Sequence, residues 1–228
     1  MSVRERLAAV QARIAERAQA LGRATGDITL VAVSKQQPIE RVMEAYECGV
    51  RHFGENTVQG LVATAQALAA AGRQARWHFI GRLQRNKINK LLPHVWLIHT
   101  VDHDELAAAL AERAGTAGVD VLVQVNVGRE KQKGGVDPEQ AVTFARRLTR
   151  LDGLRLRGLM AIPPAGADPH PFFARMAVLS QELCASSEGR GARELSLGMS
   201  DDFEAAIEHG ATLVRVGTAI FAERKYEA

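Results

Sequence analysis

The chain has 228 residues, enough to bury a substantial core, and its 46% hydrophobic and 24% charged residues are typical of a folded, soluble protein. The formal net charge of +3 is too small to indicate nucleic-acid binding by itself, and no apolar run approaches the length of a membrane-spanning helix. Cys48 and Cys184 lie far apart without metal-like spacing, which indicates reduced thiols in a cytoplasmic protein.

The first 22 residues predict an amphipathic helix rather than a targeting segment. Glu5 and Glu16 argue against a transit peptide, and the apolar core of a signal peptide is missing. We expect this helix to dock on the body of the protein through one apolar face, made of Leu7, Val10, Ile14, Ala18 and Leu21.

Apolar runs rich in β-branched residues then alternate with helical patterns to the end of the chain. The predicted strands are Ile28–Ser34, Arg51–Phe53, Arg76–Ile80, Trp96–Thr100, Val119–Val127, Leu154–Ala161, Glu194–Leu197 and Leu213–Val216. The predicted helices between them are Ile39–Cys48, Val58–Ala71, Gln84–Leu91, Asp104–Ala114, Pro138–Arg150, Pro169–Ser187 and Asp202–His209.

Repeated strand–helix units predict a parallel sheet, because each parallel connection needs a crossover. Eight units in this length fit a closed (β/α)8 TIM barrel with an extra N-terminal helix better than a doubly wound sheet. In such barrels the active site lies at the C-terminal ends of the strands. Polar residues at those ends are therefore the candidates for function.

Lys35 ends the first predicted strand, in the stretch VAVSKQQP. Alternation puts Val31, Val33 and Lys35 on one face, so we expect the lysine to point into the barrel mouth. Loss of hydration there would favour the neutral amine, which forms a Schiff base with a carbonyl. A structural ion pair with a neighbouring carboxylate is the alternative, and position alone does not decide between the two.

Two loops near the end of the chain predict a phosphate site. In LSLGMSDDFEAAIEHG, Ser200 or Asp201 is placed to cap a helix, with Glu204 completing a capping box. Gly217 and Thr218 follow the last strand, where backbone amides can approach a ligand. Loops after the seventh and eighth strands are the usual phosphate site of this fold, although an ordinary helix cap and a tight turn also explain each half.

Arg215 lies within the apolar last strand and shares a face with Leu213 and Gly217. A buried guanidinium must be hydrogen-bonded or paired, either with a carboxylate inside the barrel or with a ligand. An amine, a phosphate cradle and an inward cation together suggest pyridoxal 5′-phosphate (PLP). Lys35 would hold its C4′ atom, the two loops its phosphate, and Arg215 its ring nitrogen.

Seven motifs stand out along the chain: VAVSKQQP, HFGENTVQ, WHFIGRLQRNK, IHTVD, QVNVGREKQKGGV, LRGLMAIPP and LSLGMSDDFEAAIEHGATLVRVGTAIF. In this order, from Ile28 to Phe221, they resemble the pyridoxal-phosphate homeostasis protein family of the YggS/PROSC type. The resemblance implies a single domain over residues 1–228, similar to the barrel domain of alanine racemase standing alone, a fold-type III PLP-binding barrel.

The same resemblance implies that PLP is held as an internal aldimine on Lys35. It places Asn56 and His78 near the cofactor, and it gives phosphate-binding and ring-facing roles to Ser200, Arg215, Gly217 and Thr218. The implied role is intracellular PLP homeostasis, in which the protein buffers PLP or delivers it to apo-enzymes that depend on PLP, with other B6 vitamers as further candidate ligands.

A PLP-dependent racemase or another Schiff-base enzyme is the alternative function. Racemisation needs acid–base groups on both faces of the substrate's α-carbon, and Lys35 can serve only one face. The two tyrosines are poor candidates for the other, because Tyr46 falls within the first barrel helix and Tyr226 lies near the chain end. We therefore expect a carrier rather than an enzyme, with no catalytic residue assigned.

The remaining histidines and basic residues give weaker indications of function. His94, His99 and His103 do not share a helical face, so they are interpreted as structural or rim residues rather than metal ligands. The basic run Arg82 to Lys90 lacks interleaved aromatic residues, so no nucleic acid is expected, and a monomer is expected without the racemase's second domain. Lys131 and Lys133 are expected to be solvated, with a second docking point for phosphorylated vitamers as the alternative.

Overall fold

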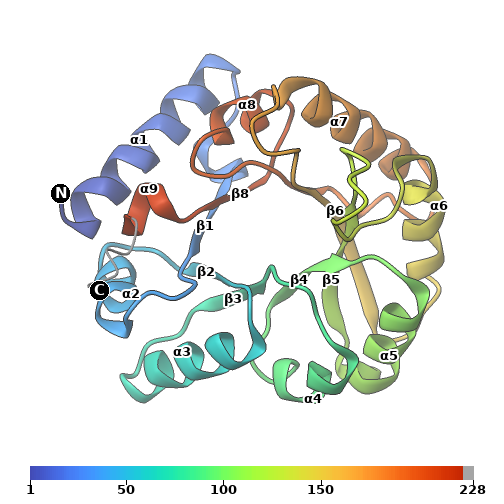
Figure 1. Ribbon diagram of the computed structural model, residues 1–228, viewed down its shortest axis with the longest axis horizontal. Helices are drawn as coiled ribbons and strands as arrows, with labels where there is room; N and C mark the ends of the chain where they lie inside the picture. Colours follow the sequence, from blue (N-terminus) through green and yellow to red (C-terminus); the bar gives the residue numbers. More distant parts are fainter. Residues whose placement is uncertain (223–228) are drawn as a thin grey trace.

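A closed barrel of parallel strands forms the centre of the computed structural model, which describes residues 1–222 (Figure 1). Each strand pairs in parallel with the next along the chain, and the last pairs with the first. This confirms the predicted (β/α)8 barrel. The strands are β1 (Thr29–Val33), β2 (His52–Glu55), β3 (Arg76–Phe79), β4 (Leu97–Val101), β5 (Val119–Val125), β6 (Leu154–Ala161), β7 (Glu194–Ser196) and β8 (Leu213–Val216).

Helices surround the barrel on its outside, as Figure 1 shows end-on. Within residues 1–222, no helix combines the length and apolar character needed to cross a bilayer. The helices are α1 (Val3–Ala20), α2 (Ile39–Glu47), α3 (Val58–Ala70), α4 (Ile88–Leu91), α5 (Asp104–Ala114), α6 (Pro138–Leu148), α7 (His170–Ala185), α8 (Phe203–Glu208) and α9 (Thr218–Phe221).

The N-terminal helix α1 docks on the barrel as predicted. Its buried face packs beside α8 and α9, and Ser2 and Glu5 close a capping box at its start. Ion pairs with α8 border this face, where Arg13 Nε lies 2.5 Å from Glu204 Oε1. One predicted member of the face is wrong: the helix ends before Leu21, whose side chain is exposed.

One predicted helix also needs correction, and one helix was missed. The helix expected over Gln84–Leu91 is divided, because residues Arg85–Lys87 form a 3-10 turn before the short α4. The helix α9 was not predicted at all. Its four residues are too few to show a helical period, so the sequence there reads as a turn after β8.

The barrel interior holds both apolar and polar side chains. Val31, Leu97, Leu122, Met160 and Leu213 come from five different strands and form one buried cluster, which confirms that Val31 and Leu213 point inward. The polar interior side chains are His52, His78, His99, Ser196 and Arg215, and all but the half-buried His52 are fully enclosed.

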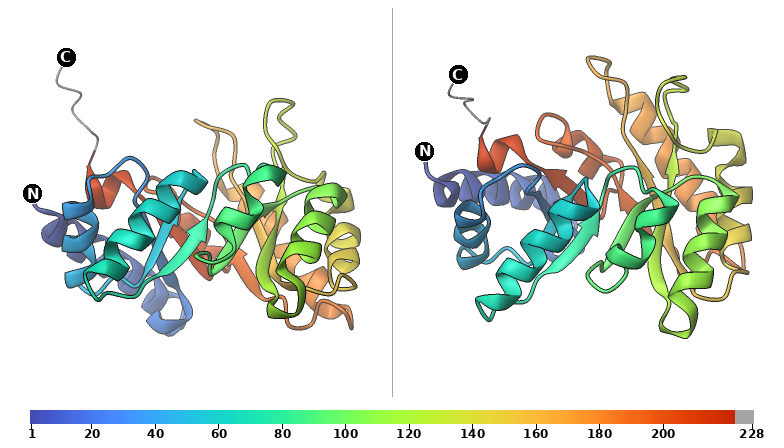
Figure 2. Two further views of the ribbon diagram at one scale, coloured as in Figure 1. Left: turned by 90° about the horizontal axis from the view of Figure 1, so that it is seen from below. Right: turned by 60° about the horizontal axis from the view of Figure 1, so that its bottom comes forward.

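The loops after β5 and β6 project from one end of the barrel (Figure 2). Lys133 Nζ donates to the carbonyl of Pro163 at 3.0 Å and lies 2.5 Å from Glu130 Oε2, so it joins the two loops. The expectation that Lys133 is solvated is therefore wrong, because its amine is used within the protein. Lys131 is exposed, as expected.

Candidate functional site

A cavity of about 410 Å³ opens among the loops at the C-terminal ends of the strands. Its volume falls within the usual range for small-molecule sites. Six of the seven residues predicted for cofactor binding line it: Lys35, Asn56, Ser200, Arg215, Gly217 and Thr218. The other lining residues are Val33, Ile80, Gly81, Met160, Ile162, Met199 and Asp201.

Lys35 reaches the cavity from a tight turn rather than from within β1. The strand ends at Val33, and the amide of Gln37 donates to the carbonyl of Ser34 at 3.0 Å. Gln36 adopts a φ of 59°, a left-handed conformation that is uncommon for a residue with a side chain and often marks functional turns.

The lysine side chain is exposed, so the expectation that it would be desolvated inside the barrel is wrong. The alternative prediction, a structural ion pair, has no support in the part of the chain that the structure describes. Lys35 takes part in no ion pair there, and its amine remains available to a ligand.

A buried carboxyl group supports this turn from below. Ser34 Oγ donates to Glu55 Oε1 at 2.7 Å, and the amide of Ser34 donates to the carbonyl of Gly54. Burial raises the pKa of Glu55, while the hydrogen bonds from Ser34 and from the Asn56 backbone lower it. These hydrogen bonds hold the turn that carries Lys35 against the C-terminal end of β2, which Asn56 follows directly in the chain.

Asn56 lies against a glycine that its position requires. A Cβ atom on Gly81 would lie 1.8 Å from the carbonyl oxygen of Asn56, so no larger residue fits there. Thr100 Oγ1 donates to the carbonyl of Gly81 at 2.6 Å and holds this segment from the other side. The loops after β2 and β3 thus meet closely at the cavity wall.

Ser200 joins the loop after β7 to the start of α9. Its Oγ accepts a hydrogen bond from the amide of Ala219 at 3.2 Å, and this brings it beside Gly217 and Thr218. The prediction that Ser200 or Asp201 caps α8 is wrong. Asp202 is the N-cap residue, and its Oδ1 accepts from the amide of Met199 at 2.6 Å, which closes the loop one residue later than expected.

Gly198 makes this loop possible. Its φ is 82°, and a Cβ there would lie 2.8 Å from Cα of Phe203 and 2.7 Å from Cβ of Ala206. The amide of Arg215 donates to the carbonyl of Gly198 at 3.0 Å. The loop after β7 is therefore held against β8, and both predicted phosphate segments face one cavity.

Arg215 forms part of the cavity wall and is only 3% exposed. Nη1 donates to Ser196 Oγ at 2.5 Å, and Nη2 donates to the carbonyl of Ala161 at 3.0 Å. Burial lowers the pKa of Arg215 to about 10, while Asp202 raises it, so the guanidinium stays charged at neutral pH. Its remaining N–H groups are available to a ligand.

His78, the seventh predicted residue, does not line the cavity. It is fully buried in the barrel interior, where Nδ1 lies 2.8 Å from His99 Nε2 and Nε2 lies 2.8 Å from His52 Nδ1. His99 Nδ1 in turn lies 2.9 Å from Ser196 Oγ, the partner of Arg215. His78 thus connects to the cavity only through other side chains.

Sequence reasoning missed two features of this site. It did not identify Asp201 as a lining residue, since the residue was taken as a helix cap. It also did not connect His52 with His78 and His99, although all three occupy inward positions on successive strands, a signal that period-two alternation contains. Within residues 1–222 no group of side chains is suited to hold a metal ion.

The donors around the cavity suit a phosphorylated aldehyde. Lys35 provides an amine, Ser200 and Thr218 provide hydroxyl groups on loops that suit a phosphate, and Arg215 provides a rigid donor on the wall. Gly217 carries no side chain to fill the space beside them, and a Cβ there would come no closer than 3.4 Å to Val33. PLP fits this set of groups.

Comparisons with known proteins agree with this interpretation. Residues 7–225 match the family described as alanine racemase, N-terminal domain. The pyridoxal phosphate homeostasis protein of Pseudomonas aeruginosa is 43% identical over 232 residues, covering 100% of this chain and 98% of that protein. The one of Aquifex aeolicus is 41% identical over 231 residues, covering 99% of this chain and 100% of that protein.

A solved structure gives the same result. PipY of Synechococcus elongatus PCC7942, with PLP bound, is 36% identical and superposes with a TM-score of 0.78, covering 91% of this chain and 99% of that chain. Together, these full-length matches show that the chain belongs to the pyridoxal phosphate homeostasis protein family, within the broader family of alanine racemase N-terminal domains.

Proposed function

We propose that this protein binds PLP in the cavity at the barrel mouth and acts in intracellular PLP homeostasis by buffering the cofactor or delivering it to apo-enzymes. The observation that carries the proposal is the convergence of the Lys35 turn, the two loops of the predicted phosphate site and Arg215 on one cavity. The names of the relatives and the PLP bound in PipY support it.

PLP would supply a reactive aldehyde, a pyridine nitrogen and a phosphate group. Lys35 would hold the aldehyde carbon through its amine, because among the described residues that line the cavity it is the only lysine. Ser200, Gly217 and Thr218 would hold the phosphate through hydroxyl and backbone N–H groups. Asn56 would contact the cofactor from the opposite wall, next to Gly81.

Arg215 would face the ring nitrogen. A guanidinium only donates hydrogen bonds, so it disfavours a proton on the pyridine nitrogen. An unprotonated ring withdraws electrons weakly, which damps carbanion chemistry at a bound amino acid. This residue therefore favours storage of the cofactor over turnover.

The described residues of the cavity offer no good candidate for the second acid–base group that racemisation needs. Among the described residues that line the cavity there is no tyrosine, histidine or cysteine. Tyr46 lies in α2, under the guanidinium of Arg51, and Tyr226 lies outside the described residues. Asp201 is the one carboxylate in the lining, and it is exposed, where water makes a carboxylate a weak general base.

Mass spectrometry after borohydride reduction tests the cofactor claim. Reduction of the purified protein loaded with PLP should leave one pyridoxyl group on Lys35. The Lys35→Ala variant should carry none, whereas the control Lys90→Ala, at an exposed position away from the cavity, should be labelled like the wild type. An adduct on another residue would overturn the assignment.

Racemisation and transfer assays separate the carrier from the enzyme. The carrier proposal expects PLP to reach an added apo-enzyme, while free amino acids keep their configuration. Lys35-dependent racemisation that Asp201→Asn abolishes would instead establish the enzymatic alternative. Delivery to apo-enzymes, the cytoplasmic location and the monomeric state stay predictions from the sequence.

A further inference from the structure

The polar side chains of the barrel interior form one continuous hydrogen-bonded chain. It begins at His52 on β2, passes through His78 on β3 and His99 on β4, and crosses the barrel to Ser196 on β7 and Arg215 on β8. Successive contacts measure 2.8, 2.8, 2.9 and 2.5 Å. The cavity at the C-terminal ends of the strands thus has a polar connection through the core to His52, at the N-terminal end of β2.

A neutral imidazole has one donor and one acceptor, so three in series must all point the same way. Burial keeps the imidazoles neutral by holding the pKa of His78 and of His99 well below the ordinary value, and burial with the nearby Arg76 lowers the pKa of His52 to about 4. The chain therefore has only two hydrogen-bond directions.

The Arg215 end selects one of these directions. Arg215 can only donate, and it occupies one lone pair of Ser196 Oγ. The hydroxyl proton of Ser196, which is fully buried, then points to Nδ1 of His99, since within residues 1–222 its Oγ contacts no other acceptor. Leaving that proton without an acceptor would carry the desolvation penalty of a buried, unsatisfied donor.

The His52 end of the chain can accommodate the hydrogen-bond direction that Arg215 sets. His52 Nε2 then carries a proton and faces Arg76 Nη1, also a donor, at a long distance of 3.5 Å. His52 is half-buried and Arg76 is exposed, so both groups can bind water instead. The mismatch thus falls where solvent can relieve it.

We propose that His52, His78, His99 and Ser196 are positioning residues for Arg215, forming a one-directional hydrogen-bond chain that fixes the plane of its guanidinium at the cavity wall. The chain commits Nη1 to Ser196 and, together with the hydrogen bond from Nη2 to the Ala161 carbonyl, leaves the N–H groups that neither contact uses in a set orientation toward the ligand. This rests on the proposed role of Arg215 beside the cofactor, but the order of the guanidinium is a property of the protein alone.

The tautomers of the three histidines provide the first test. Nitrogen-15 NMR of the cofactor-free protein should show His52, His78 and His99 all protonated at Nε2. Protonation of His78 or His99 at Nδ1 would overturn the proposed direction. This measurement needs no variant, so it holds even where a substitution prevents folding.

Disconnecting the chain provides the second test. His99→Leu removes a residue that reaches Arg215 only through Ser196, and it should make the guanidinium N–H protons of Arg215 exchange at least about tenfold faster with solvent. PLP should also dissociate about tenfold faster. The control Leu122→Val, a smaller change in the same interior, should alter neither rate.

Unchanged exchange at Arg215 in the folded His99→Leu variant would overturn the positioning role. His99→Asn, which keeps a polar atom near Nδ1, the position that contacts Ser196, should recover part of the wild-type protection, whereas a purely structural role would make the recovery follow stability alone. If PLP did not bind the wild type, the proposed function would fail, while the exchange and tautomer measurements would still decide this inference.

Discussion

The cavity rim and the barrel interior use their polar side chains in opposite ways. At the rim, Lys35 is exposed and in no ion pair within the described residues, and Thr218 is exposed beside it. In the interior, each ring nitrogen of His78 and His99 lies within 3 Å of another side chain. The rim can therefore offer hydrogen bonds to a ligand, whereas the polar side chains of the interior bond to one another. Among the described residues, Arg215 is the polar side chain that belongs to both regions.

The largest expected effect comes from removing the exposed amine at the cavity rim. Lys35→Ala should abolish the visible absorbance of bound PLP, because no other lining residue within 1–222 has a side-chain amine. Stability should stay within about 0.5 kcal/mol of the wild type, as for most exposed positions. Absorbance spectra and denaturant unfolding measure the two effects, and a large loss of stability would show that the rim also has a structural role.

Arg215→Lys tests the residue that both regions share. Lysine keeps the charge but loses the planar fork, so it cannot serve Ser196, Ala161 and a ligand together. We expect the free energy of unfolding to fall by about 1–3 kcal/mol and PLP binding to weaken as well. Equal stability with weaker binding would assign Arg215 to the rim alone.

Much of the rim was predictable from the sequence, and much of the interior was not. Alternation along single strands gave the inward faces of Val31, Leu213 and Arg215, and the fold then gathered the strand ends at one cavity. Alternation does not say which residues meet across a barrel. The contact of His99 with Ser196 joins residues 97 positions apart and needs the closed geometry.

The errors at the rim have a local cause. Lys35 was predicted to point inward because the alternation of Val31 and Val33 was continued to Lys35, whereas β1 ends at Val33 and is followed by a turn with the left-handed Gln36. The cap of α8 was placed at Ser200 or Asp201 because all three residues of Ser200–Asp201–Asp202 are good N-caps. The choice of Asp202 depends on the path of the loop, in which Gly198 packs closely against Phe203 and the Met199 amide donates to Asp202.

The interior should make stability depend on pH. The unfolded chain takes up protons at the ordinary histidine pKa of 6.5, but the buried His78 and His99, with folded pKa values well below this, do not. Stability is therefore full above about pH 6.5 and falls as the pH drops below it, with each of these residues adding about 1.4 kcal/mol per pH unit to the slope.

Denaturant unfolding between about pH 8 and pH 5 measures this slope. His99→Gln should flatten it, since the replacement does not titrate, and the control His94→Gln, outside the interior chain, should leave it unchanged. An equal slope in all three proteins would mean that the buried histidines are charged in the folded state, which the neutral chain does not allow.

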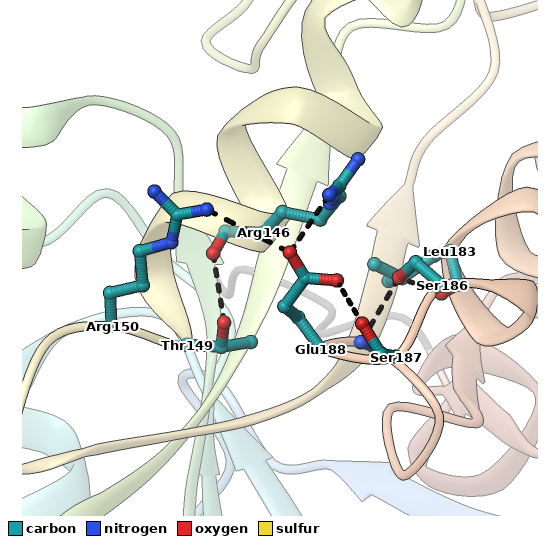
Figure 3. A network of polar contacts seen from close by, with 8 residues as sticks. Arg146, Thr149, Arg150, Leu183, Ser186, Ser187 and Glu188 are labelled. Carbon is teal, nitrogen blue, oxygen red and sulfur yellow. Dashed lines mark hydrogen bonds and ion pairs between the residues drawn. The ribbon is translucent and has the colours of Figure 1, made fainter.

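The smallest effect belongs to an ion-pair network on the outer surface, where α6 meets the turn after α7 (Figure 3). Glu188 accepts hydrogen bonds from Arg146 and Ser187, each at 2.8 Å, and Arg150 lies 3.7 Å away. The Arg146 and Ser187 hydrogen bonds lower the pKa of Glu188 to about 2. Its contribution to stability is thus present above the unfolded pKa of 4.5 and is lost as the pH falls toward about 2.

Because water and salt screen this partly exposed network, Glu188→Gln should lower the melting temperature only slightly, and less at high than at low ionic strength. If salt did not reduce this loss of melting temperature, Glu188 would stabilise the protein through its hydrogen bonds, like the barrel interior, rather than through its charge.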